Sequence, residues 1–257
     1  AATLADGIDV ASALELNVAL DTTMPRDRIS FAGPGKTDEE VARAVAAGIV
    51  FNLESENEME SVARHAAEQG LVAPVAVRVN PDFELKTSGM RMSGGPKQFG
   101  VDAERVPAML QRMGELGSLQ FHGFHIFSGS QNLRSEALVE AQTNTVALAI
   151  DLAQYAPGPL HHLNIGGGFG IPYFPGDTTL ELAPIADNLS GLLDKVKFEL
   201  GDVRTVIELG RYIVGEAGVY VSRIVDRKVS RDRVFLITDG GLHHQLAASG
   251  NFGQFIR

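Results

Sequence analysis

The segment LNIGGGFGIPY, residues 163 to 173, runs from an apolar β-type pattern into three consecutive glycines, Gly166, Gly167 and Gly168. Glycine weakens strands and helices, so such a cluster marks either a tight bend or a row of backbone N–H groups open to an anion such as phosphate. A dinucleotide-binding fingerprint is excluded because Ile171 stands where its third glycine is required, and the lysine of a P-loop is missing. A glycine turn at the end of a strand remains, and both uses of it stay open.

Short β-type runs alternate with amphipathic helical patterns on either side of this segment. Two of the helical patterns begin with capping-box spacing, Ser12 with Glu15 and Thr37 with Glu40. Regular alternation of this kind predicts parallel βαβ units. The β-type runs are residues 7–12, 29–33, 49–55, 74–80, 121–129, 161–166 and 205–210.

Seven such runs fit either an open doubly wound sheet or a (β/α)8 barrel that is one strand short of eight. Two further β-type runs, residues 219–225 and 233–240, follow them. In (β/α)8 enzymes a turn after a late strand often holds a phosphate on backbone N–H groups. The glycine turn at residues 166–168 has this place in the chain.

Composition limits the partners. The chain has 257 residues, 44% of them hydrophobic, which is enough for one barrel-type domain, and its formal net charge is −10. Lys and Arg gather in no block, which argues against a nucleic-acid or anionic-membrane partner and favours a small molecule. No apolar run reaches the length of a membrane span, and the absence of cysteine fits a reducing cytosol. The first residue is not Met, so we expect the chain to begin inside a longer gene product.

A second motif, IELGRYIVGEAG at residues 207–218, places Glu208 at the end of the seventh run and Arg211 three residues later. A carboxylate at a strand end faces a barrel's active site, and a planar guanidinium suits a phosphate. An ordinary ion pair between Glu208 and Arg211 is an equally open alternative.

Taken together, the motifs resemble one family. GIDVAS, GPGK, NPD followed by FG, GFHIFSGSQ, GGGFGIPY, ELGR and DGG occur in the order and approximate spacing of the ornithine, diaminopimelate and arginine decarboxylases. These enzymes use pyridoxal phosphate on an alanine-racemase-like barrel. The resemblance covers essentially the whole chain, and the run DGGLHHQLAASGNFGQ at residues 239–254 is similar to a diaminopimelate-decarboxylase-like branch, some members of which act on carrier-tethered amino acids.

The resemblance implies an α/β fold, a (β/α)8 TIM-type barrel with its first strand missing, followed by the start of a C-terminal β-domain. We expect residues 1–225 to form the pyridoxal-phosphate-binding barrel domain and residues 226–257 to begin the β-domain. The lysine that forms the Schiff base in relatives lies on the first barrel strand, so we expect it to be absent from this chain. Neither Lys36, in the GPGK motif, nor Lys86, in an irregular loop, occupies the position of that lysine.

The resemblance also implies site residues. Glu208 corresponds to the catalytic carboxylate that pairs with the pyridine nitrogen, where racemases of the same fold have an arginine. The glycines, Arg211 and Ser130 would hold the phosphate, and Arg78 and Asp9 would position the ring and its partners. For Arg78 an interior ion pair is the alternative. The implied cofactor-binding residues are Gly166, Gly167, Gly168, Arg211, Ser130, Phe127, His125, Arg78 and Asp9.

The run GFHIFSGSQ departs from the family pattern. Aligned without a gap on Gly129, Ser130 and Gln131, it puts Phe127 where relatives have the histidine that stacks on the cofactor ring. His125 stands two residues earlier and would share a strand face with Phe127. We favour Phe127 as the stacking residue, because any aromatic face can stack.

The predicted function is therefore the decarboxylation of an amino acid with pyridoxal phosphate, a diaminopimelate-like substrate being favoured. The alternatives are a carrier-protein-linked amino acid, a non-catalytic homologue that binds a protein partner, and a racemase, against which Glu208 speaks. We expect a cytoplasmic homodimer that binds neither nucleic acid nor membrane. The histidines show no metal-ligand spacing, so no metal site is predicted.

Overall fold

A computed structural model describes residues 4–84, 90–91, 93–241 and 244. The chain divides into two compact units, Ala1–Glu208 and Leu209–Arg257. The division falls directly after Glu208. The predicted domain boundary between residues 225 and 226 stays a prediction.

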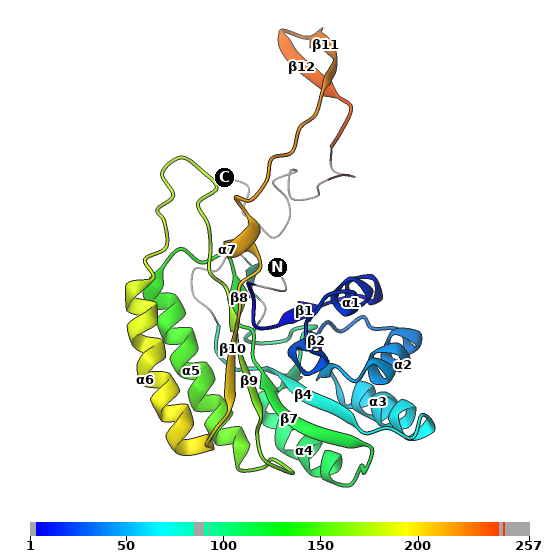
Figure 1. The fold of residues 1–257 in the computed structure, drawn as a ribbon. Coiled ribbons are helices and arrows are strands. Elements are labelled where there is room, and N and C mark those ends of the chain that lie inside the picture. The colour runs from blue at the N-terminus through cyan, green and yellow to red at the C-terminus, as the bar shows by residue number, and fades with distance from the viewer. Residues whose placement is uncertain (1–3, 85–89, 92, 242–243, 245–257) are drawn as a thin grey trace. The chain divides into compact units, whose positions relative to one another are not determined.

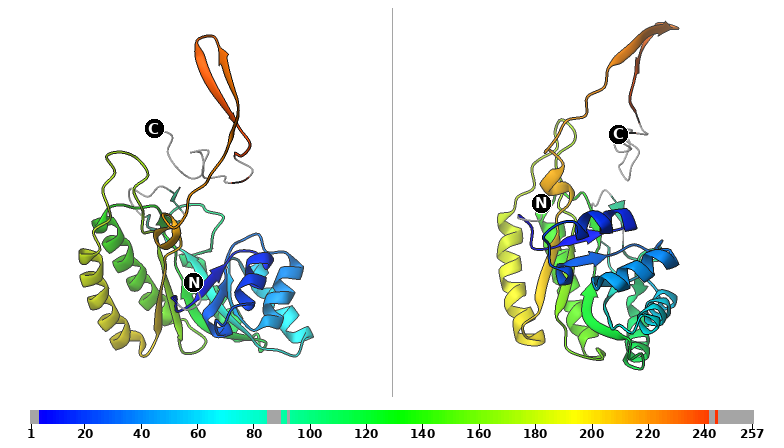
Figure 2. Two further views of the ribbon diagram at one scale, coloured as in Figure 1. Left: turned by 45° about the horizontal axis from the view of Figure 1, so that its top comes forward. Right: turned by 45° about the vertical axis from the view of Figure 1, so that its right-hand side comes forward.

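The first unit is built on a parallel sheet whose strands follow one another in chain order. Its main strands are β1 (Ile8–Val10), β2 (Ile29–Phe31), β3 (Val50–Leu53), β4 (Ala73–Asn80), β7 (Leu119–His125), β9 (His162–Gly167) and β10 (Arg204–Glu208). The short β6 (Val101–Asp102) pairs with β4. All seven predicted strands are confirmed, and Figures 1 and 2 show the sheet curving toward a barrel with the helices outside it.

Helices fill the connections between these strands. They are α1 (Ala13–Leu20), α2 (Asp38–Ala47), α3 (Glu56–Glu68), α4 (Val106–Gly114), α5 (Ser135–Ala153) and α6 (Ala183–Leu200), with 3-10 turns η1 (Arg26–Arg28) and η2 (Ala103–Arg105). None of the helices in the described ranges is both long and apolar enough to cross a membrane.

The predicted capping boxes turn out differently at the two helices. At α2 the box is complete, since Thr37 Oγ1 accepts from the Glu40 N–H and the Glu40 carboxylate accepts from the Thr37 N–H. At α1 the Ser12 side chain caps the Glu15 N–H, but the Glu15 carboxylate accepts from the Ala11 N–H, one residue before the cap. Both helices start where the sequence predicts.

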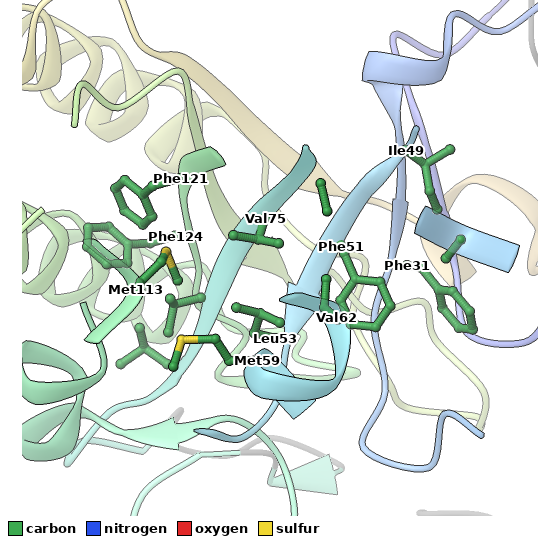
Figure 3. Close-up of a cluster of buried hydrophobic side chains, with 14 of the residues drawn as sticks. Phe31, Ile49, Phe51, Leu53, Met59, Val62, Val75, Met113, Phe121 and Phe124 are labelled. Atoms are coloured by element: carbon green, nitrogen blue, oxygen red, sulfur yellow. The ribbon is translucent and has the colours of Figure 1, made fainter. Parts of the chain in front are cut away.

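The hydrophobic core lies between the sheet and its helices. Figure 3 shows Phe31, Phe51 and Leu53 on β2 and β3 packed near Met59 and Val62 of α3, each of them at most 1% exposed. The Phe31 and Phe51 ring centroids are 6.1 Å apart. These strands are buried on both faces, as parallel strands beneath helices are. This core fixes the strand ends that carry the polar residues described below.

The strand predicted over residues 121–129 ends early. The structure ends β7 at His125, and the chain then turns so that β8 (Gly129–Ser130) pairs antiparallel with β5 (Met90–Arg91) in a separate sheet. Phe127 lies in the connection between β7 and β8, outside both strands. The expectation that His125 and Phe127 share one strand face is therefore wrong.

The second unit contains α7 (Arg211–Val214) and an antiparallel hairpin of β11 (Ile224–Ser230) and β12 (Arg233–Thr238). The two-residue turn consists of Arg231 and Asp232, with φ of 48° and 62°. Two positive φ angles are typical of the primed turns that match the twist of a hairpin. That this hairpin begins a C-terminal β-domain stays a prediction.

Candidate active site

Polar side chains gather at the C-terminal ends of the barrel strands. Parallel strands carry these ends to one edge of the sheet, which is where barrel enzymes place their active sites. The residues at this edge are Asp9 of β1, Ser30 of β2, Asn52 and Glu54 at the end of β3, Arg78 and Asn80 of β4, His125 of β7, Asn164 of β9 and Glu208 of β10.

Glu208 is held from two strands. Asn164 Nδ2 donates to its Oε1 at 2.6 Å, and His125 Nε2 lies 3.1 Å from the same oxygen. The His125 side chain is 2% exposed and that of Glu208 is 19% exposed. Burial alone would raise the pKa of Glu208, but His125, Asn164 and the more distant Arg78 outweigh it and hold this pKa below its ordinary value. Glu208 is therefore ionised at neutral pH.

Asp9 has the opposite tendency. Burial of its carboxylate and the negative charge of Glu208 raise the pKa of Asp9, while a hydrogen bond from Ser30 Oγ opposes the shift. Asp9 as a whole residue is exposed to solvent, and this solvent weakens both effects on its pKa. Asn52 Nδ2 in turn donates to Ser30 Oγ at 3.2 Å, so a chain of hydrogen bonds links three strand ends.

The backbone of the turn at residues 166–168 requires glycine. Gly166 and Gly168 have φ of 72° and 89°, in the region that favours glycine. A Cβ on Gly166 would lie 2.8 Å from the Ile126 carbonyl oxygen, and one on Gly167 would collide with the Glu208 carbonyl oxygen. The turn thus bends the chain and lets it pack closely against its neighbours. The phosphate-binding use of the turn stays a prediction.

The segment after β7 lies beside this turn. The Asn132 N–H donates to the Gly168 carbonyl at 2.8 Å, and the Gly170 N–H donates to the Asn132 carbonyl at 2.9 Å. These bonds bring the segment that carries Ser130 to the glycines. A Cβ on Gly166 would lie 3.2 Å from Cδ2 of Phe127, so the Phe127 ring borders the turn.

The structure therefore brings together Glu208, His125, Phe127, Ser130 and the glycine turn. The assignment of Phe127 as the stacking residue stays a prediction. His125 is 1% exposed, and neither of its ring nitrogens has a hydrogen bond of good geometry in the described part of the chain. Buried polar atoms of this kind call for a ligand or water.

Arg78 forms the interior ion pair that was the alternative reading of this residue. Its Nη1 lies 2.7 Å from Glu54 Oε1, and the two side chains are 6% and 2% exposed. Glu54 also accepts from the Gly33 N–H at 2.6 Å and from the Gly100 N–H at 2.8 Å. The Arg78 guanidinium lies 4.8 Å from the centre of the Phe99 ring. The proposed effect of Arg78 on the cofactor stays a prediction.

Lys36 is part of the same buried network. Its Nζ donates to the Gly33 carbonyl at 2.7 Å, to the Asn52 carbonyl at 3.0 Å and to Glu58 Oε1 at 3.0 Å. Burial lowers the pKa of Lys36, and Glu58 partly offsets that effect. Lys36 thereby ties the loop before α2 to the end of β3. Lys86 lies outside the described residues.

Sequence reasoning missed Glu54 and Asn164. Glu54 stands at the end of its strand in the run IVFNLES, as Glu208 does in IELGR, and this position was the available signal. Asn164 stands two residues before Gly166 within the quoted glycine segment. Arg211 belongs to the second unit, so its predicted contact with a phosphate stays a prediction.

The residues of the first unit fit pyridoxal phosphate. An ionised carboxylate suits a protonated pyridine nitrogen, the His125 ring lies against that carboxylate, and the Phe127 ring borders the glycine turn. In the described part of the chain no hydrogen bond reaches Glu208 Oε2, whereas Oε1 accepts from Asn164. One oxygen of the carboxylate is thus left for a ligand.

Comparison with known proteins agrees with this fit. Residues 1–215 match the family model described as pyridoxal-dependent decarboxylase, pyridoxal binding domain. The chain is 34% identical over 245 residues to the L-glutamyl-[BtrI acyl-carrier protein] decarboxylase of Niallia circulans, covering 95% of this chain and 57% of that protein. It is 34% identical over 248 residues to the diaminopimelate decarboxylase of Aquifex aeolicus, covering 96% of this chain and 58% of that protein.

Solved structures agree as well. Diaminopimelate decarboxylase from Helicobacter pylori complexed with L-lysine superposes with a TM-score of 0.81 at 27% identity, covering 95% of this chain and 60% of that one. The α/β barrel predicted from the sequence is confirmed by this likeness. The chain spans 57% to 58% of the length of the two curated relatives named above.

Proposed function

Because the chain belongs to the family of pyridoxal-dependent decarboxylases, whose pyridoxal-binding domain it contains, we propose that the protein removes the α-carboxylate of an amino acid with pyridoxal phosphate as its cofactor. The observation that carries this proposal is the half-buried Glu208 carboxylate, which Asn164 holds beside the glycine turn and whose pKa lies below its ordinary value. A carboxylate at this position favours a decarboxylase over a racemase, because racemases of this fold have an arginine there.

Each residue has a distinct task. When bound, pyridoxal phosphate supplies an electron sink for the electron pair released with carbon dioxide. Glu208 would keep a proton on the ring nitrogen, because an ionised carboxylate favours the protonated base beside it. His125 and Phe127 would lie beside the ring, and Phe127 is the proposed stacking residue.

The glycine turn would hold the phosphate of the cofactor. Gly166, Gly167 and Gly168 offer backbone without side chains, and Ser130 adds a hydroxyl donor from the neighbouring segment. From the family resemblance alone, we also propose that the Arg211 guanidinium would bind the phosphate.

Arg78 and Asp9 act at a distance. Arg78 contributes positive charge that helps to keep Glu208 ionised, while its own position is fixed by Glu54. Asp9 lies close enough to Glu208 for the charge of Glu208 to raise its pKa. We assign both residues to positioning of the ring.

For the substrate we propose a diaminopimelate-like amino acid first and a carrier-protein-linked amino acid second. Two curated relatives with equal identity to this chain, one named for each kind of substrate, support the two candidates. A cytoplasmic homodimer remains part of the proposal. The prediction that the lysine joined to the cofactor lies outside this chain stays a prediction.

A substrate assay tests the proposal. The full-length protein is loaded with pyridoxal phosphate and offered free diaminopimelate, ornithine, arginine and lysine, and released carbon dioxide and the chirality of each amino acid are measured. We expect release from diaminopimelate. No release from any free amino acid would favour the carrier-linked candidate, while racemisation without release would contradict decarboxylation.

A further inference from the structure

Asn164 joins the two halves of the candidate site. Its side chain is fully buried on β9, where Nδ2 donates to Glu208 Oε1 at 2.6 Å and Oδ1 accepts from the Gly166 N–H at 2.8 Å. Its backbone carbonyl accepts from the Ile126 N–H at 2.9 Å, at the point where the chain leaves β7. One residue thus touches the carboxylate, the glycine turn and the segment that leads to Phe127.

The chemistry of these contacts fixes the side chain. An ionised carboxylate only accepts hydrogen bonds, so Glu208 requires the amide nitrogen, and the Gly166 N–H only donates, so it requires the amide oxygen. A short neutral side chain with both a donor and an acceptor meets both needs. Leucine has nearly the same shape but can form neither bond.

We propose that Asn164 is a positioning residue that holds the Glu208 carboxylate and the first glycine of the phosphate turn in one hydrogen-bonded unit. This inference rests on the proposed function. Through Asn164, the group that meets the ring nitrogen and the turn that meets the phosphate keep a fixed separation. The cofactor should therefore bind more weakly when either bond is lost.

Charged and titratable groups from several strands face Glu208 and set its response to pH. They are His125 on β7, Arg78 on β4, Asp9 on β1 and His162 on β9. An aspartate in place of Asn164 would add a carboxylate in contact with Glu208. Two adjacent buried carboxylates share one proton and titrate as a pair, with the upper pKa raised.

This sharing gives a test that a purely structural role would not reproduce. In Asn164→Asp at low pH, the shared proton lets the new carboxyl donate to Glu208 while its other oxygen accepts from Gly166, as the amide does. At high pH the proton is lost and the two negative charges repel each other. The variant should therefore match the unchanged protein at low pH and fail at high pH, whereas Asn164→Leu should fail at both.

The experiment measures the dissociation constant of pyridoxal phosphate for the full-length protein by fluorescence titration. Each variant is compared with the unchanged protein at the same pH, at about pH 5 and about pH 9. We expect Asn164→Leu to weaken binding about 10- to 100-fold at both values, the effect of losing hydrogen bonds to a charged group. We expect Asn164→Asp to stay within about 3-fold at the lower pH and to lose about 10-fold or more at the higher one.

Controls separate the possible failures. Asn188→Asp changes a half-buried asparagine of α6 that is bonded to Gln142, and it should leave binding unchanged at both pH values. Circular dichroism checks that each variant folds. If Asn164→Leu or Asn164→Asp does not fold, Asn164→Ser replaces it, and its shorter side chain should still weaken binding.

Two results would overturn different statements. Equal binding by folded Asn164 variants and the unchanged protein, or the same loss for Asn164→Asp at both pH values, would overturn the inference. Failure of the unchanged full-length protein to bind pyridoxal phosphate would overturn the proposed function instead.

Discussion

Glu54 and Glu208 each bring a carboxylate to the end of a parallel strand, after β3 and at the end of β10, but their oxygens are used differently. Glu54 Oε1 accepts from Arg78 and the Gly33 N–H, and its Oε2 accepts from the Gly100 N–H. Glu208 has close contacts to Asn164 and His125 through Oε1, and in the described residues no hydrogen bond reaches its Oε2. A saturated carboxylate supports the fold, while a carboxylate with one oxygen left over can serve a ligand.

The comparison extends to the surroundings of each residue. Around Glu54 the cations Arg78 and Lys36 are buried and paired with carboxylates, Arg78 with Glu54 and Lys36 with Glu58. Around Glu208 stand a turn of three glycines and the buried His125, whose ring nitrogens have no hydrogen bond of good geometry within the described residues. Removing the charge of Glu54 should therefore lower the stability of the fold, and removing the charge of Glu208 should lower the rate of the reaction.

The largest expected effect is on turnover in Glu208→Gln. The neutral amide cannot keep the ring nitrogen protonated, so we expect turnover to fall about 100- to 1,000-fold while pyridoxal phosphate is still bound. Carbon dioxide release at saturating cofactor measures the effect. Glu39→Gln, an exposed change on α2, is the control and should remain active.

The next effect is on stability in Glu54→Gln. This change leaves the buried Arg78 without its counter-charge, so we expect the free energy of unfolding to fall by about 3 to 5 kcal/mol. Urea denaturation gives this value. Glu60→Gln breaks an exposed pair with Arg112 at 2.7 Å and should change stability little. A folded Glu54→Gln protein that lost turnover without losing stability would assign Glu54 to the reaction and erase the contrast with Glu208.

A pH effect comes next, from a histidine in the strand that carries Asn164. Burial, followed by the charges of Arg204 and His125, lowers the pKa of His162 from its ordinary 6.5 to about 4. Between these values the unfolded chain binds a proton that the folded protein does not. Stability should therefore fall as the pH drops from about 6.5 to about 4, by about 2 to 3 kcal/mol for this residue.

Urea denaturation across that range measures the fall. His162→Gln should remove most of it, and His161→Gln, the exposed neighbour, should keep it. A fall that is the same in both variants would mean that His162 is not the group that titrates.

The smallest effect concerns the glycine turn. Gly166→Ala puts a side chain at positive φ and also against the Ile126 carbonyl and the Phe127 ring, and we expect a loss of about 1 to 3 kcal/mol in stability. Gly48→Ala has a similar φ of 67° with nothing within 4 Å, so it reports the cost of φ alone. Equal losses in the two variants would show that close packing at Gly166 is unimportant.

Much of the fold and part of the site could be predicted from the sequence. The alternation of β-type runs with helical patterns predicted the seven strands. Glu208 and the glycines were found because they lie in short motifs at strand ends. The end of β7 was not found, since it depends on Ile126 bonding to Asn164 and on residues 129–130 pairing with residues 90–91. Asn164 and Glu54 were missed because their partners are distant in the chain, 44 residues away for Glu208 and 24 for Arg78.

The most direct test of the contrast between the two carboxylates is the ¹⁵N NMR shift of the ring nitrogen in labelled pyridoxal phosphate bound to the full-length protein. We predict a protonated nitrogen in the unchanged protein and in Glu54→Gln molecules that remain folded, and an unprotonated one in Glu208→Gln. A nitrogen whose protonation is unaffected by Glu208→Gln, or that loses its proton in Glu54→Gln instead, would contradict the assignment of Glu208 as the partner of the cofactor ring.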